Sequence, residues 1–339
     1  MAGQVTLSDV ARQAGVSLAT ASRALNGSAN RTVGADLRER VLEAASRLRY
    51  SPDGIAQAMA RGRTTALGLV VPDIADPACA ELASGVVAAA EDAGMSVTLT
   101  STRHEPGREA ALVALLGRQR ARAVVLAGGR QADPAGEQAV RAAVDSFRAV
   151  GGAVASVGRA AFGVPTVVVG DREGASDLVT ALHGRGYRRF AVLAGPQTHT
   201  LAADRSAGAV AALAALGCPP PVVLRGAFSR DGGYEGMRQL VEDRVDAQVV
   251  VAVSDVMAAG ALAAARDAGL SVPGDVAVAG YGDVGLLRDA MPGLTTVRLP
   301  FADIGARAVR LALEPPADGE PETIRVTGQV VLRGSTPGV

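Results

Sequence analysis

The sequence predicts a small all-α head followed by a larger α/β core built from two doubly wound parallel sheets. Two observations carry this prediction. Residues 1–50 show the apolar spacing of short helices, whereas from Ala66 onward short β-branched runs alternate with alanine-rich stretches. Alternation of this kind is typical of parallel sheets that helices cover on both faces. A chain of 339 residues is also long enough for two or three such domains.

The first two helices of the head are indicated by their end signals. Thr6 can cap free N–H groups, and Asp9 follows at the spacing of a capping box. Gly15 is expected to end this helix, because glycine accepts the left-handed conformation that closes one. Ser17 then caps a second helix that runs to about Leu25. Two helices joined by so short a turn have the spacing of a helix-turn-helix.

A third helix is expected over residues 35–49, with Leu37, Val41, Leu42, Ala45 and Leu48 on its buried side. Pro52 marks a break, and a short helix-capable stretch and a linker follow it. We therefore expect a helix-turn-helix head of residues 1–51, a short helix and linker of residues 52–65, and a core of residues 66–339.

The core is expected to contain two subdomains, because its strands are too many for one sheet. Strands are predicted at residues 67–71, 96–100, 123–126, 153–157, 190–193, 222–224, 249–253 and 276–279. Helices are predicted near residues 80–93, 107–118, 135–149, 173–185, 203–216, 232–242, 255–268 and 301–313. A ligand is expected in the cleft beyond the carboxyl ends of the strands.

The composition disfavours several classes of protein. Cys79 and Cys218 form no paired motif, which fits a reducing compartment and offers no thiolate metal site. The sequence shows no secretory signal and no apolar run of the roughly 18 residues that a membrane helix needs. It also has no lysine for a phosphate-binding loop and no hydrolase or zinc-protease motif. We expect a cytoplasmic protein without enzymatic activity, cofactor or metal.

The second helix has two faces that suit DNA recognition. Ala21, Ala24 and Leu25 face inward, and the outward positions are Leu18, Ala19, Ser22 and Arg23. An arginine can donate two hydrogen bonds to guanine, and apolar side chains can contact thymine methyl groups. Ser22 or Thr20 could reach a phosphate. The alternative is an ordinary helical hairpin with a solvated arginine face.

The charge distribution favours the DNA-binding interpretation. The whole chain has 34 basic and 34 acidic residues, so its formal charge is zero. Residues 1–64, however, contain nine arginines and five acidic residues, and residues 65–339 carry the balancing excess of four acidic residues. A basic head on an acidic core is the electrostatic pattern of a nucleic-acid-binding protein.

The segment TLSDVARQAGVSLATASRALNG resembles the DNA-binding head of the LacI/GalR family of bacterial transcription regulators. The resemblance continues through RERVLEAASRLRYSPDGIAQAMARGRTTALGLVVPDIADP and VAVSDVMAAGALAAARDAGLSVPGDVAVAGYGD to VVLRGSTP, and so covers essentially the whole chain. It implies a two-lobed, periplasmic-binding-protein-like core and a homodimer on a pseudo-palindromic DNA operator. It further implies a repressor controlled by an effector between the lobes, expected to be a sugar or related metabolite. The alternatives are a regulator of the same fold that responds to a non-sugar ligand, and a solute receptor without DNA function.

The resemblance also implies roles for residues of the head and hinge. Base-reading positions correspond to Leu18, Ala19 and Arg23, and phosphate or positioning contacts to Ser17, Thr20, Ser22 and Asn26. In the hinge, the minor-groove segment corresponds to Ile55, Ala56 and Met59, with Met59 as an apolar wedge between base pairs or, alternatively, a linker contact. Three departures from the family pattern are two extra residues near position 31, Gly34 in place of a hydroxyl cap, and Asp53 in place of asparagine.

The effector positions that the resemblance implies come from both lobes. They are Asp76, Ala78, Cys79, Arg159, His199, Arg205, Phe228, Ser254, Asp255 and Asp283, and Tyr281 is added as an aromatic that could stack on a ligand. Arg205 is expected to bind hydroxyls or a carboxylate, with a surface arginine as the alternative. Asp255 could instead cap the helix from Val256, Phe228 could be a core residue, and His199 could be a simple loop residue. The usual aromatic platform is missing after the first strand, which leaves a non-sugar effector open.

Overall fold

The structure is a computed structural model, and it describes residues 5–26, 33–50, 64–105, 107–128, 133–314 and 321–339. The chain divides into two compact units, Met1–Thr64 and Thr65–Val339.

The head contains helices α1 (Leu7–Ala14), α2 (Leu18–Asn26) and α3 (Ala35–Arg47). The capping box predicted at the start of α1 is present, because the Thr6 side chain accepts from the backbone N–H of Asp9 and Asp9 bonds back to Thr6. Gly15 ends α1 in the left-handed conformation, with φ at 64°. The three helices pack around a small core of Val10, Ala11, Ala14, Ala21, Ala24, Val41, Ala44 and Ala45.

The prediction for the buried side of α3 is wrong at two positions. Leu37 is 38% exposed and Leu42 is 47% exposed. The buried stripe instead runs through Val41, Ala44 and Ala45. Leu42 lies about 100° around the helix from Val41, and Leu37 lies in the first turn, beyond the end of this stripe.

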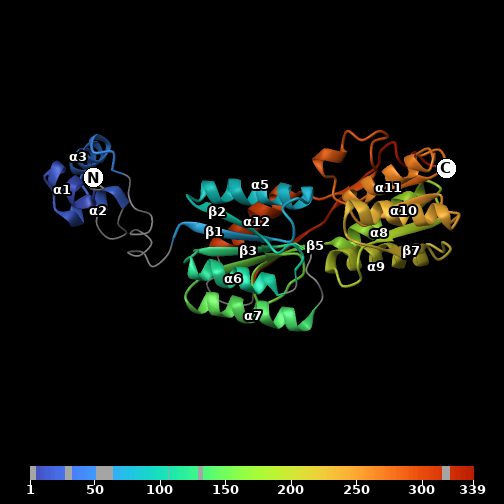
Figure 1. Cartoon of the computed structure of the whole chain (residues 1–339), viewed down its shortest axis with the longest axis horizontal. Helices are drawn as coiled ribbons and strands as arrows, with labels where there is room; N and C mark the ends of the chain where they lie inside the picture. Colours follow the sequence, from blue (N-terminus) through green and yellow to red (C-terminus); the bar gives the residue numbers. More distant parts are fainter. Residues whose placement is uncertain (1–4, 27–32, 51–63, 106, 129–132, 315–320) are drawn as a thin grey trace. The chain divides into compact units, whose positions relative to one another are not determined.

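The first lobe of the core is a six-stranded parallel sheet with helices on both faces. Its strand order is β11-β5-β4-β3-β1-β2. The strands are β1 (Ala66–Val71), β2 (Ser96–Ser101), β3 (Ala123–Ala127), β4 (Ala153–Val157), β5 (Thr166–Val169) and β11 (Thr323–Val326). Figure 1 shows α5 (Pro77–Asp92) and α12 (Phe301–Leu313) on one face, and α6 (Arg108–Arg118) and α7 (Pro134–Ala149) on the other.

The second lobe is a four-stranded parallel sheet of order β7-β6-β8-β9. Its strands are β6 (Phe190–Ala194), β7 (Val222–Arg225), β8 (Val249–Ala252) and β9 (Ala277–Ala279). Two helix pairs pack with it, α8 (Asp171–Gly184) with α9 (Thr200–Ala215) and α10 (Arg230–Glu242) with α11 (Asp255–Asp267). A short antiparallel pair, β10 (Thr296–Arg298) with β12 (Gln329–Val331), accompanies the chain segments that pass between the lobes.

The prediction of a helical head and two doubly wound parallel sheets is confirmed. Four short strands, β5, β10, β11 and β12, are absent from the prediction, because runs of three or four residues carry almost no periodic signal. Among the helices of the described residues, none is long and apolar enough to cross a membrane.

Candidate functional site

A cavity of about 860 Å³, counted with its open mouth, lies between the two lobes of the core. Val71, Val157 and Val169 bring to it the carboxyl ends of three strands of the six-stranded sheet. His199, Ser254 and Asp255 bring to it the amino ends of helices from the second lobe. Carboxyl strand ends and amino helix ends therefore converge here, which is the usual place for a ligand in doubly wound folds.

Most of the effector residues predicted from the sequence line this one cavity. They are Asp76, Ala78, Cys79, His199, Arg205, Phe228, Ser254, Asp255 and Tyr281. Arg159 and Asp283 are not among the lining residues. The Arg159 guanidinium is instead held outside the wall by Asp204, through hydrogen bonds of 2.8 and 2.7 Å.

Arg205 is buried in the cavity wall rather than exposed on the surface. Its Nε donates to Oδ1 of Asp171 at 2.7 Å, and its Nη1 donates to the carbonyl of Val253 at 2.9 Å. Its guanidinium also lies over the ring of Tyr281, 4.1 Å from the centroid. Burial raises the pKa of Asp171, although the charge of Arg205 opposes this shift. The arginine is therefore an internal partner of an acid as well as a wall residue.

His199 and Phe228 form a stacked pair in the second lobe. Their ring centroids are 4.4 Å apart and the planes differ by 16°. Nδ1 of His199 accepts from the backbone N–H of Ala202 at 3.4 Å, so His199 caps α9 rather than being a simple loop residue. Burial, and then the charge of Arg205, lower the pKa of His199 to about 4. A neutral imidazole that accepts at Nδ1 has its proton on Nε2, which remains a donor.

Ser254, and not Asp255, caps α11. The Ser254 hydroxyl accepts from the backbone N–H of Met257 at 3.2 Å, so the capping alternative for Asp255 is wrong. Asp255 instead accepts from the Thr296 hydroxyl at 2.6 Å and from the backbone N–H of Val284 at 2.9 Å. On the opposite lobe, Asp76 caps α5 through the N–H of Ala78. Burial raises the pKa of both aspartates.

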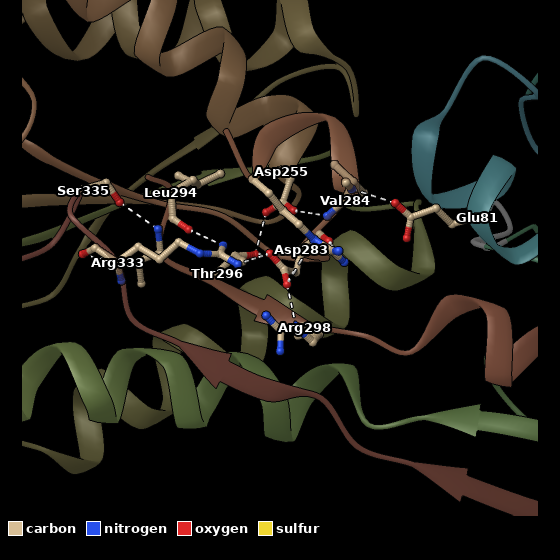
Figure 2. A network of polar contacts seen from close by, with 12 residues as sticks. Glu81, Asp255, Asp283, Val284, Leu294, Thr296, Arg298, Arg333 and Ser335 are labelled. Atoms are coloured by element: carbon tan, nitrogen blue, oxygen red, sulfur yellow. Dashed lines mark hydrogen bonds and ion pairs between the residues drawn. The ribbon is translucent and has the colours of Figure 1, made fainter. Parts of the chain in front are cut away.

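Asp255 belongs to a polar network that reaches both the other lobe and the C-terminal segment (Figure 2). Next to Val284, the backbone N–H of Gly285 donates to Oε1 of Glu81 at 2.7 Å. Glu81 lies on α5 of the first lobe, so this hydrogen bond joins the two lobes.

Asp283 lies in the same network but faces arginines instead of the cavity. Its carboxylate contacts Nε of Arg298 at 2.6 Å and Nη2 of Arg333 at 2.7 Å (Figure 2). Although burial opposes it, these guanidinium groups lower the pKa of Asp283. The carboxylate therefore ties the C-terminal segment to the second lobe.

Helix α2 presents the predicted outward face at Leu18 and Ala19, whereas Ser22 and Arg23 on the same side are half-buried. Leu18 is 51% exposed and Ala19 is exposed, whereas Ala21 and Ala24 are buried. The Ser17 hydroxyl accepts from the N–H of Thr20 at 3.1 Å and lies 2.8 Å from the Thr20 hydroxyl, so these two groups define the start of the helix. Nε of Arg23 donates to the carbonyl of Ala19 at 3.0 Å, which holds the guanidinium along the helix.

Four predicted DNA-contacting positions lie outside what the structure describes. Ile55, Ala56 and Met59 fall in the segment 51–63, and of Asn26 only the backbone is described. Ser22 is half-buried on α2, beside the exposed positions.

Sequence reasoning missed Asp171 and His104, which both line the cavity. Asp171 is the first residue of α8, two positions after β5 ends, and an acid just beyond a parallel strand is a typical site signal. The four-residue strand was not recognised, so its strand-end acid was not either. His104 follows β2 and its ring centroid lies 6.2 Å from that of His199, a proximity that only the folded chain shows.

Comparison with known proteins agrees with this architecture. Residues 6–53 match the model described as bacterial regulatory proteins, lacI family, and residues 179–336 match a periplasmic binding protein-like domain. The chain is 31% identical over 314 residues to catabolite control protein A of Priestia megaterium, covering 91% of each protein. It is also 31% identical over 311 residues to the HTH-type transcriptional repressor CytR of Escherichia coli K12, covering 91% of this chain and 89% of CytR.

Two solved structures are similar over almost the whole chain. The complex of the transcriptional regulator CelR with cellobiose has a TM-score of 0.71 at 30% identity, covering 98% of this chain and 99% of CelR. The Lac repressor dimer bound to operator and the anti-inducer ONPF has a TM-score of 0.84 at 24% identity, covering 99% and 100%, and it supports the fold alone. With the head, the two-lobed core and these relatives all in agreement, the chain belongs to the LacI family of bacterial regulatory proteins.

Proposed function

We propose that this protein is a homodimeric transcriptional repressor that binds a pseudo-palindromic DNA operator and releases or holds it according to a small molecule in the interlobe cavity. The observation that carries the proposal is the outward face of α2, where the exposed Leu18 and Ala19 lie next to the half-buried Arg23 on a head stabilised by its own core. An amphipathic second helix of this kind enters the major groove with its outward side chains. CytR, which is named a transcriptional repressor, and CelR, which is named a transcriptional regulator, support the same function.

The roles of single side chains follow from their chemistry. Arg23 reads a guanine through two hydrogen bonds, and Leu18 and Ala19 contact thymine methyl groups or the groove wall. Ser17 and Thr20, at the start of α2, bind phosphate and set the register of the helix. Within 51–63, Ile55, Ala56 and Met59 pack into the minor groove at the centre of the operator, and Met59 kinks the duplex there.

The test begins with selection of binding sequences from random DNA by the full-length protein, followed by affinity measurements at fixed salt. Arg23→Ala is expected to reduce the preference for the selected operator over shuffled DNA by about 5- to 100-fold, the equivalent of one bidentate base contact. Arg12→Ala is the matched control, because this exposed arginine lies on α1 and is paired with Asp9. An equal loss on operator and shuffled DNA would show that Arg23 contributes charge and does not read a base.

A separate measurement addresses the hinge. Met59→Ala is expected to reduce operator bending, followed by the mobility of circularly permuted DNA fragments, while leaving the selected sequence unchanged. Unchanged bending would remove the wedge role from Met59 without affecting the assignment of α2.

A further inference from the structure

The walls of the interlobe cavity are mostly apolar. Leucine, valine, phenylalanine and isoleucine side chains from both lobes line it, among them Leu82, Val157, Leu299, Phe301 and Ile304. Polyhydroxylated ligands need a polar partner for nearly every hydroxyl group that they bury, since a buried hydroxyl without one loses its hydrogen bonds to water and gains none in return. This cavity favours a ligand whose surface is largely hydrocarbon.

The polar side chains of the wall are for the most part already bonded within the protein. Asp171 and Arg205 bind each other, and the Tyr281 hydroxyl donates to the carbonyl of Asp171. Both oxygens of Asp255 accept hydrogen bonds, from Thr296 and Val284. Because these bonds use only part of the hydrogen-bonding capacity of Arg205 and the carboxylates, a ligand with many hydroxyl groups would find few, rather than no, free polar partners in the wall.

The charge of the wall disfavours an anion. Of the described residues that line the cavity, Arg205 is the only arginine, and its charge is balanced by Asp171 at 2.7 Å. Asp76 and Asp255 add two acids, which either repel an anion when ionised or offer it no positive charge when protonated. A neutral or cationic ligand meets no such penalty.

Two groups remain suited to one polar edge of a ligand. Asp76 on the first lobe has one oxygen bonded to the N–H of Ala78, and a carboxylate has a second oxygen that can accept. His199 on the second lobe accepts at Nδ1, which leaves Nε2 as a donor. A hydroxyl group both donates and accepts, so it could bind either of these groups.

We propose that the effector is an uncharged, largely apolar ring compound with a hydroxyl group at one edge, such as a phenol or an alicyclic alcohol, and neither a sugar nor an anion. This inference rests on the proposed function, in which the cavity holds the effector. It departs from CelR, whose solved complex contains cellobiose, because the wall in this chain is mostly apolar and several of its polar groups are bonded to one another.

Matched pairs of small molecules test the inference on the full-length protein by thermal unfolding. Cyclohexanol and myo-inositol share a six-membered carbon ring and differ in their hydroxyl groups, and 4-hydroxybenzyl alcohol and 4-hydroxybenzoate share a phenol and differ in charge. At tenfold excess over their dissociation constants, cyclohexanol and 4-hydroxybenzyl alcohol are each expected to raise Tm by about 2–5 °C. Myo-inositol and 4-hydroxybenzoate are expected to leave Tm unchanged.

Two substitutions tie any shift to the cavity. Ala78 lines the cavity and Ala80 is an exposed residue of the same helix that does not, so Ala78→Phe is expected to abolish the shift and Ala80→Phe to keep it. Asp76→Asn removes one acid from the wall. It is therefore expected to lower the ratio of the dissociation constants of 4-hydroxybenzoate and 4-hydroxybenzyl alcohol at least threefold.

The outcomes separate the inference from the function on which it rests. Stabilisation by myo-inositol or 4-hydroxybenzoate equal to that by its partner, or no shift with either neutral compound at 20 mM, would overturn the ligand class. Retention of the Tm shift in the Ala78→Phe variant would also overturn the ligand class. Operator binding is measured on the same samples, so a protein that binds its operator but fails these tests keeps the proposed function and loses only the ligand class.

Discussion

Removing one partner of the buried ion pair between Arg205 and Asp171 should strongly destabilise the folded core. Their side chains are only 7% and 5% exposed, and the donor and acceptor are 2.7 Å apart. Removing either partner leaves the other charge buried without its counter-ion. Arg205→Leu and Asp171→Leu are therefore each expected to lower the free energy of unfolding by about 3–5 kcal/mol. For a domain of about this size, such losses lower Tm by roughly 6–20 °C.

The double variant carries the decisive information. When Arg205→Leu and Asp171→Leu are combined, neither charge remains in the wall, so the total loss should be smaller than the sum of the single losses by at least about 2 kcal/mol. The pair of Arg159 and Asp204 is the matched control, since it has the same two residue types in hydrogen-bond contact but its arginine side chain is 57% exposed. Arg159→Leu is expected to lower stability by only about 0–1 kcal/mol.

Urea and thermal unfolding of the full chain measure these differences. Protein concentration must be held constant, because a dimer shifts its own apparent stability with concentration. Single losses below about 1 kcal/mol, or a double variant that equals the sum of the two, would refute the view that the arginine is committed to the aspartate. Arg205 would then be available to a ligand, and the ligand class inferred from its pairing would weaken with it.

As pH falls from 6.5 to 4, His199 becomes protonated in the unfolded chain, whereas burial keeps it neutral in the folded chain down to about pH 4. This difference destabilises the fold at low pH, so His199→Gln should recover up to about 3 kcal/mol of the stability lost over this range. Urea unfolding at each pH measures the effect. Gly260→Ala should lower stability by more than about 2 kcal/mol, because a Cβ there would collide with the backbone of α10, whereas Gly184→Ala, with no atom within 4 Å of its Cβ, should be neutral or slightly stabilising in the same thermal assay. Glu81→Ala removes the acceptor of the hydrogen bond between the lobes, so it should speed tryptic cleavage after Arg288. Glu81→Gln keeps a side-chain oxygen that can accept this bond, so it should leave the cleavage rate unchanged. Equal cleavage rates in both variants would show that loss of the accepting oxygen does not cause the faster cleavage.

The head and most core elements could be predicted because their signals are local. Thr6, Asp9 and Gly15 determine the ends of α1 through contacts within a few residues, and the structure has the same bonds. The alternation of strands and helices likewise depends only on short-range patterns. Leu37 and Leu42 show the limit of such patterns, since the helix period places a residue on a face but does not say how far the partner helices extend.

The cavity could be predicted as a set of residues but not as a set of bonds. Asp76, His199 and Ser254 line it as expected, because strand and helix ends meet at one edge of each sheet. Arg205 and Asp171, however, are 34 positions apart and meet only through the packing of α8 against α9. Because β5 is absent from the sequence prediction, Asp171 is not predicted as a site residue, and no acidic partner is predicted for Arg205.

Pairing within the wall decides what a cavity of this fold can bind. An arginine whose charge is balanced by Asp171, and whose Nη1 is bonded to Val253, offers a ligand fewer free N–H donors and less uncompensated charge than the same residue would if it stood alone. A relative that keeps the arginine but lacks the buried acid would present a cation to the ligand at the same place. Similarity in fold and residue type across the family can therefore coexist with a change in ligand class, because a few buried hydrogen bonds separate the two cases.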